Sequence, residues 1–249
     1  MNLSIGTCSL FASALILAGC ATAPVLEQRL GQVLPDDASA SYDALSDTVT
    51  LGKGGSSIVL PKTGTVGTAS LFQNAGLTSN ALHMETASGA GRVLVFNSED
   101  PDLGVVGAIA SRDGGVTLPA SGSAVFNGGY SSLLVRASDK VATSAPTGAA
   151  CLSASFGAAP TIGGTIVNRS YGLADIVIPS TPLSAGGVFS GAVTGGESPG
   201  GTTSNGRVSG MFADVGAGEI VGVLQLDHNI SGTDYYEVGG FTTVAGACP

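Results

Sequence analysis

The sequence GRVSGMF at 206–212, followed by GEIVGVLQL at 218–226, decides the fold of this chain. In each segment every second residue is apolar or glycine, which is the pattern of a β-strand with one buried face. The residues expected on that face are Val208, Gly210 and Phe212 in the first segment and Ile220, Gly222, Leu224 and Leu226 in the second. Both segments are therefore predicted to be strands of a sheet that covers a core.

The same pattern recurs at regular intervals from residue 121 onward. The candidate strands are 122–127, 130–137, 150–156, 162–168, 174–178, 187–194, 206–213, 218–227 and 234–243. Glycine-rich turn signals separate them, such as Asn127-Gly128-Gly129 and Gly195-Gly196. Glycines inside the strands are typical of the bends of a small curved barrel. We predict an all-β protein with a C-terminal, eight-stranded antiparallel barrel at 121–249, its interior filled by side chains.

A smaller N-terminal β region is predicted at 42–120. The alternating residues 47–51 and the return strand 57–60 flank Lys53-Gly54-Gly55, which is a hairpin signal. A second predicted hairpin pairs 92–96 with 103–109.

The N-terminus carries a targeting signal. Leu17-Ala18-Gly19-Cys20 closes an apolar run that is too short to span a bilayer and suits a signal peptide. It resembles a bacterial lipobox, which implies cleavage before Cys20 and lipid attachment to that thiol, although residues 1–9 lack the usual Lys or Arg. We therefore expect a signal peptide at 1–19 and a lipidated tether at 20–41. The absence of aspartate after Cys20 favours the outer membrane of a Gram-negative bacterium, at its surface or its periplasmic face.

The tether and the remaining cysteines give two further expectations. The apolar residues of 25–34 have helical spacing and predict a short helix. Cys8 lies in the signal peptide and Cys20 is the lipidation site, which leaves Cys151 and Cys248 in an oxidising compartment. Two such thiols usually pair, so we predict a Cys151–Cys248 disulfide.

Composition excludes several classes of function. The net charge of −9 argues against nucleic-acid binding, because an acidic surface repels phosphate. The sequence contains no catalytic motif and only two histidines, so we expect no enzymatic activity, no cofactor and no metal site. The acidic residues at 99–102 are expected to be a hydrated turn, and Asp227, His228 and Asp234 a solvated loop.

Tyrosines are the candidate contact residues. Tyr235 and Tyr236 are neighbours in one strand and point to opposite faces, so one of them is expected to face outward. Beside Tyr130 or Tyr171 it would form a binding patch.

Two pairs of segments resemble a known family. SASFG at 153–157 leads into TIGGTI at 161–166, and SGMF at 209–212 leads into EIVG at 219–222. Over residues 121–245 their order and spacing resemble the C-terminal barrel of the transferrin-binding protein B family. The resemblance implies that 42–120 take the place of the handle-like region of one lobe. It also implies a surface lipoprotein that binds a host or environmental protein or a small solute.

Two classes of function remain open from the sequence. The first is a surface-exposed binding lipoprotein, attached to the membrane at Cys20. Its ligand is expected on the loops or in the groove between the two regions, because the lumen is filled. The second is a structural or protective envelope lipoprotein without a dedicated ligand.

Overall fold

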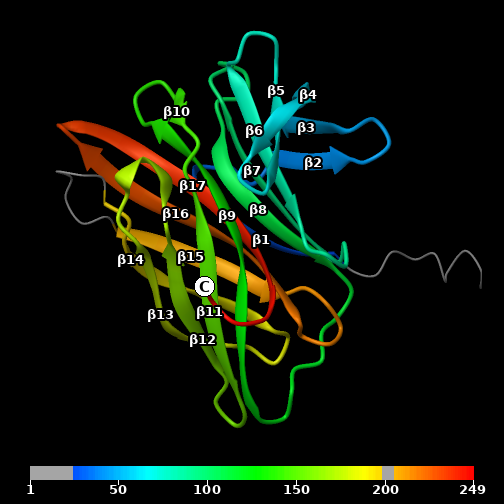
Figure 1. Cartoon of the computed structure of the whole chain (residues 1–249). Coiled ribbons are helices and arrows are strands. Elements are labelled where there is room, and N and C mark those ends of the chain that lie inside the picture. Colours follow the sequence, from blue (N-terminus) through cyan, green and yellow to red (C-terminus); the bar gives the residue numbers. More distant parts are fainter. Residues whose placement is uncertain (1–24, 198–204) are drawn as a thin grey trace, which may run out of the picture.

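The computed structural model describes residues 25–197 and 205–249, which form two antiparallel sheets. The N-terminal sheet is curled and contains β1 (Val25–Val33), β2 (Ser39–Asp43), β3 (Thr48–Lys53), β4 (Ser56–Val66), β5 (Ala69–Gln73), β6 (Ser79–Glu85), β7 (Gly91–Ser98) and β8 (Val106–Asp113). The C-terminal sheet contains β9 (Gly122–Arg136), β10 (Ala142–Ser144), β11 (Thr147–Phe156), β12 (Thr161–Val167), β13 (Ile176–Pro182), β14 (Val188–Gly195), β15 (Asn205–Phe212), β16 (Glu219–Ile230) and β17 (Thr233–Ala245). Figure 1 shows the curled sheet packed against one side of the barrel.

The C-terminal sheet closes on itself because its last long strand, β17, pairs with its first, β9. The predicted eight-stranded antiparallel barrel is thus confirmed, with β10 as a short additional arm beside β9. The predicted faces are also confirmed, since Ile220, Leu224 and Leu226 of β16 belong to the barrel core. Within the described residues, no helix is long and apolar enough to span a membrane.

The turn predicted at Asn127-Gly128-Gly129 is wrong, because β9 runs through it as one continuous strand. Gly128 and Gly129 allow neighbouring segments to approach the backbone of β9 closely. A Cβ at Gly128 would overlap the backbone carbonyl of Thr242 in the neighbouring β17, and one at Gly129 would overlap the side chain of Thr68 in the turn between β4 and β5. The two candidate strands 122–127 and 130–137 are therefore one.

Both hairpins predicted in the N-terminal region are present. β3 and β4 pair across a two-residue turn in which Gly54 and Gly55 have φ of 57° and 90°, values that favour glycine. β7 pairs with β8 in the second hairpin.

The predicted helix is wrong, because residues 25–33 form β1, which pairs with β8. Leu26 and Leu30 pack against the core between the sheets. Their separation of four residues fits one face of a strand as well as one face of a helix, and the free edge of β8 decides between them.

Three buried clusters hold the molecule together. One fills the barrel, one fills the curl of the N-terminal sheet, and the third lies between the sheets and takes side chains from both. Arg112 of β8 crosses this interface and donates hydrogen bonds to the carbonyls of Phe212 (2.7 Å) and Gly186 (2.8 Å). From the barrel side, the Glu219 carboxylate accepts from the backbone N–H (3.0 Å) and hydroxyl (2.5 Å) of Ser88. The two sheets therefore form one packed body.

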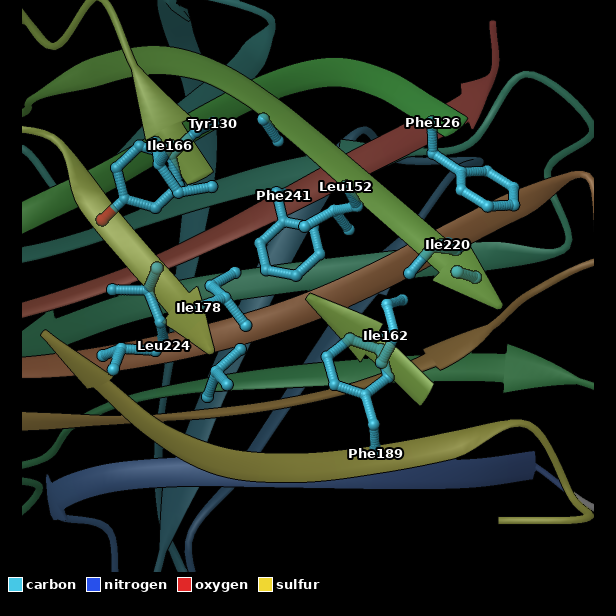
Figure 2. Close-up of a cluster of buried hydrophobic side chains, with 14 of the residues drawn as sticks. Phe126, Tyr130, Leu152, Ile162, Ile166, Ile178, Phe189, Ile220, Leu224 and Phe241 are labelled. Carbon is cyan, nitrogen blue, oxygen red and sulfur yellow. The ribbon is translucent and has the colours of Figure 1, made fainter. Parts of the chain in front are cut away.

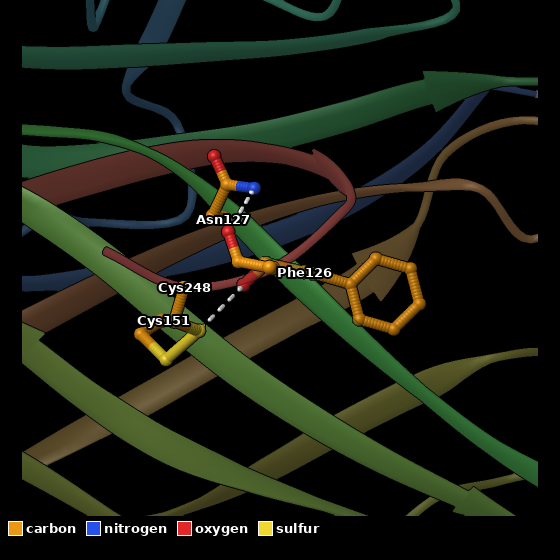
Figure 3. Close-up of a disulfide and its surroundings, with 5 residues drawn as sticks. Phe126, Asn127, Cys151 and Cys248 are labelled. Carbon is orange, nitrogen blue, oxygen red and sulfur yellow. Dashed lines mark hydrogen bonds between the residues drawn. A yellow bond between two sulfur atoms is a disulfide. The ribbon is translucent and has the colours of Figure 1, made fainter.

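The predicted Cys151–Cys248 disulfide is present, with a Cα–Cα distance of 5.5 Å (Figure 3). Cys151 lies on the face of β11 opposite the buried Leu152. Asn127 of β9 donates from its side chain to the carbonyl of Ala247 at 2.8 Å. The C-terminal segment is thus held against the outer face of the barrel.

Candidate functional site

Among the described residues, the barrel lumen is occupied by buried side chains. Figure 2 shows large residues from strands on different sides of the barrel converging on its axis. Among the labelled residues, Phe126, Phe189 and Phe241 are at most 2% exposed. A ligand must therefore bind elsewhere, as predicted from the size of the barrel.

Part of the lumen is filled by a buried charged cluster. The side chains of Arg169 and Glu237 are fully buried, and Arg169 Nη2 lies 2.5 Å from both carboxylate oxygens. Glu237 also accepts hydrogen bonds from Tyr130 Oη (2.7 Å), Ser132 Oγ (2.9 Å) and His228 Nε2 (2.8 Å). This cluster joins β9, β16 and β17 to the segment that follows β12.

The cluster keeps Glu237 ionised. Burial opposes ionisation, but the hydrogen bond from His228 and the charge of Arg169 outweigh it and lower the pKa of Glu237 to about 2. Burial and the neighbouring Glu237 charge raise the pKa of Tyr130 well above its usual value, so its hydroxyl remains a donor. Since all these groups are enclosed, the cluster is suited to holding the barrel together rather than to chemistry on a substrate.

The candidate functional site is a groove of about 600 Å³ between the two sheets. The N-terminal sheet and the segment after β1 contribute Arg29, Leu30, Gly31, Leu34 and Asp36, and the barrel contributes Asn205, Gly206, Arg207, Gln225 and Asp227. We call these residues the inter-sheet groove. They come from parts of the sequence about 180 residues apart, and a hydrogen bond from Ser209 Oγ to Gln28 Oε1 (2.6 Å) connects the sheets beside them.

The inter-sheet groove is polar and carries both signs of charge. The side chain of Arg207 is exposed and, within the described residues, has no hydrogen-bond or ion-pair partner. Arg29 is held by the backbone carbonyls of Asp36 and Ala38, and its Nε is buried without a partner in the described part of the chain. With the carboxylates of Asp36 and Asp227 nearby, the groove can receive a ligand that itself carries both charges.

The four candidate tyrosines do not form one patch. Tyr130 is 1% exposed and lies in the lumen, so it cannot belong to a surface site. Tyr171 is 66% exposed and lies in the short 3-10 turn η1 (Ser170–Gly172). Tyr235 and Tyr236 are half-buried near the start of β17. Because both are half-buried, the expectation that one of the two faces outward stays a prediction.

The predicted solvated loop also differs from what the structure shows. The solvated loop at Asp227, His228 and Asp234 is wrong for His228, which is 4% exposed and points to Glu237. Asp234 instead accepts from the side chain of Asn229 at 2.7 Å. Within residues 25–197 and 205–249, no group of three or more metal-ligating side chains is placed to hold an ion. Cys20 lies outside the described residues.

The individual residues of the groove were not predicted from the sequence, although a groove between the two regions was. Arg29 and Arg207 belong to strands with no local motif. One signal was available, since Arg207 is the single charged residue within GRVSGMF. Arg29, on the opposite side of the groove, could not be predicted, because only the packing of β1 on the barrel places it there.

Comparison with known proteins concerns the fold. No family model and no curated protein matches the chain. Among solved structures, intact Ap-TbpB with its N and C lobes is similar, with 14% identity over 89% of this chain and 46% of that one, at a TM-score of 0.49. The Trp-176-Ala mutant of transferrin-binding protein B from Haemophilus parasuis is similar with 12% identity over 88% of this chain and 45% of that one, also at 0.49. The chain spans less than half the length of either protein.

Proposed function

We propose that this chain is a lipid-anchored protein of the outer membrane that binds a protein or a small solute in the inter-sheet groove. The observation that carries the proposal is the pairing of a filled barrel lumen with an open polar groove in which Arg207 is unpaired within the described residues. The lipobox-like segment ending at Cys20 supports the anchor, and the Cys151–Cys248 disulfide is consistent with an oxidising compartment.

The anchor and the orientation are tested on cells that express the full chain. We expect labelled palmitate to be incorporated into the native protein and not into the Cys20→Ser variant. Protease treatment of intact cells should remove the protein while a periplasmic control survives. If the protein survives until the outer membrane is opened, it faces the periplasm, and the ligand must be a periplasmic solute or protein.

Binding in the inter-sheet groove is tested by reversing one charge. Arg207→Glu should abolish the capture of a ligand that the native protein retains, because it turns a cation that has no side-chain partner among the described residues into an anion. Lys140→Glu makes the same change of charge in the turn between β9 and β10, away from the groove, and should leave capture intact. Equal capture by all three proteins would show that the groove is not the binding site.

A structural envelope role is the second candidate. The observation that favours it is the enclosed interior, in which the Arg169–Glu237 cluster and a disulfide fasten the barrel. Under this alternative, deletion of the protein weakens the envelope, and Arg207→Glu restores the deletion strain as well as the native protein does. The binding proposal expects Arg207→Glu to fail in that assay if the phenotype depends on the ligand.

A further inference from the structure

A second cavity lies at one side of the curled N-terminal sheet. It measures about 190 Å³ and is lined by residues of β1, β2, β6, β7 and β8. We call it the curled-sheet cavity. It shares no lining residue with the inter-sheet groove, so the function proposed above neither requires it nor explains it.

Aromatic and apolar side chains line part of this cavity. The rings of Tyr42 and His83 stack with centroids 4.0 Å apart and planes inclined by 26°. Leu94 and Ile109, which are 8% and 6% exposed, add apolar surface from β7 and β8. A ligand that enters therefore meets an aromatic pair beside a small apolar surface.

His83 is buried and incompletely satisfied. It is 7% exposed, and its Nε2 has no hydrogen-bond partner within the described residues. Burial lowers the pKa of His83, so its ring is neutral near pH 7 and one of its nitrogens carries a free lone pair. A buried polar atom without a partner costs free energy, and a bound hydrogen-bonding group offsets that cost.

The lining of the cavity carries one acidic and one basic side chain, Glu27 and Arg92, which differ in how they are engaged. Glu27 lines it from β1 and is exposed, and no cation pairs with it in the described part of the chain. Arg92, the cation of the lining, is already held by Glu85 (3.1 Å) and Asp113 (3.0 Å). Arg29, two residues beyond Glu27, is engaged by backbone carbonyls. An entering cation is thus favoured over an entering anion.

We propose that the curled-sheet cavity binds a small organic ammonium ion, with Glu27 as its counter-charge and the rings of Tyr42 and His83 as its aromatic contacts. A cation beside an aromatic ring is stabilised by the ring quadrupole, and the effect increases when water is excluded. The cavity volume of about 190 Å³ suits a headgroup of a few heavy atoms rather than a polymer or a large cofactor.

The test uses the full chain carrying Cys20→Ser, with choline chloride as the probe and 3,3-dimethylbutan-1-ol as its uncharged analogue of the same shape. Calorimetry measures affinity, and NMR of the histidine rings locates the site. The chain has two histidines, and His228 in the barrel serves as an internal reference for His83. We expect choline to saturate one site and to shift the His83 signals while those of His228 stay unchanged.

Two variants test the role of charge. Glu27→Gln should weaken choline binding about tenfold, which is the effect of losing one nearby counter-charge. Glu99→Gln removes the same charge from the β7–β8 loop, outside the lining, and should leave the affinity unchanged. Glu27 is exposed, so its variant should fold normally. The proposal is overturned if the alcohol binds as well as choline, if the two variants behave alike, if His228 shifts in place of His83, or if choline shows no saturable binding.

Discussion

Glu237→Gln should strongly destabilise the barrel at pH 7. The substitution keeps the shape of the side chain but leaves the buried guanidinium of Arg169 without its counter-ion. Removing one partner of a buried ion pair costs roughly 3–5 kcal/mol. The lowering of the Glu237 pKa from 4.5 to about 2 independently corresponds to about 3 kcal/mol of native-state stabilisation. The two routes agree on a loss of at least about 3 kcal/mol in the free energy of unfolding.

The assay is urea unfolding followed by far-UV circular dichroism, because the chain contains no tryptophan. Since the pKa of Glu237 is lowered in the native state, its contribution is complete above pH 4.5 and declines as the pH falls toward 2. The difference between the native protein and Glu237→Gln should therefore be large at pH 7 and narrow near pH 3. Glu99→Gln serves as the control. A loss below about 1 kcal/mol at pH 7, or a gap that does not narrow in acid, would refute this account of the cluster.

Three further substitutions test other parts of the fold. Cys151→Ser opens a loop of 97 residues and should lower the free energy of unfolding by at most about 4–5 kcal/mol, measured against the native protein with and without reductant. Gly128→Ala should cost about 1–3 kcal/mol in thermal unfolding, because its Cβ meets the backbone of β17, whereas Gly64→Ala points into open space and should be neutral. Tyr130→Phe should cost about 1–2 kcal/mol by removing one donor to Glu237, and its effect should be smaller in the Glu237→Gln background.

Alternation along single strands was sufficient to predict the barrel and its inward faces, because residues such as Leu152 and Leu224 depend only on the two-residue period of a strand. Alternation did not predict the structure where contacts between distant segments determine it. Gly128 has the appearance of a turn residue, but the close approach of β17 requires it within a strand. The spacing of Leu26 and Leu30 fits both regular structures, and only the edge of β8 selects the strand.

The polar residues show the same limit. His228 and Tyr130 are polar residues that were predicted to lie at the surface, yet both point to Glu237 in the lumen. The sequence gives no sign of this, because Arg169 lies between 39 and 68 positions from these groups along the chain. A buried polar cluster requires every member to be satisfied, so it becomes visible only when all of its strands are placed.

The filled lumen has a consequence for where binding can occur. A barrel of this size has room for its own side chains, and here the Arg169–Glu237 cluster uses part of that room for charge. Opening the lumen to a ligand would expose an ion pair whose geometry depends on several strands. The curled N-terminal sheet, unlike the barrel lumen, has open space beside it. Its strand β1 borders the inter-sheet groove through Arg29 and the curled-sheet cavity through Glu27. Ligands bound in the inter-sheet groove and the curled-sheet cavity, as proposed above, would contact the edge strand β1 and leave the core of the barrel undisturbed.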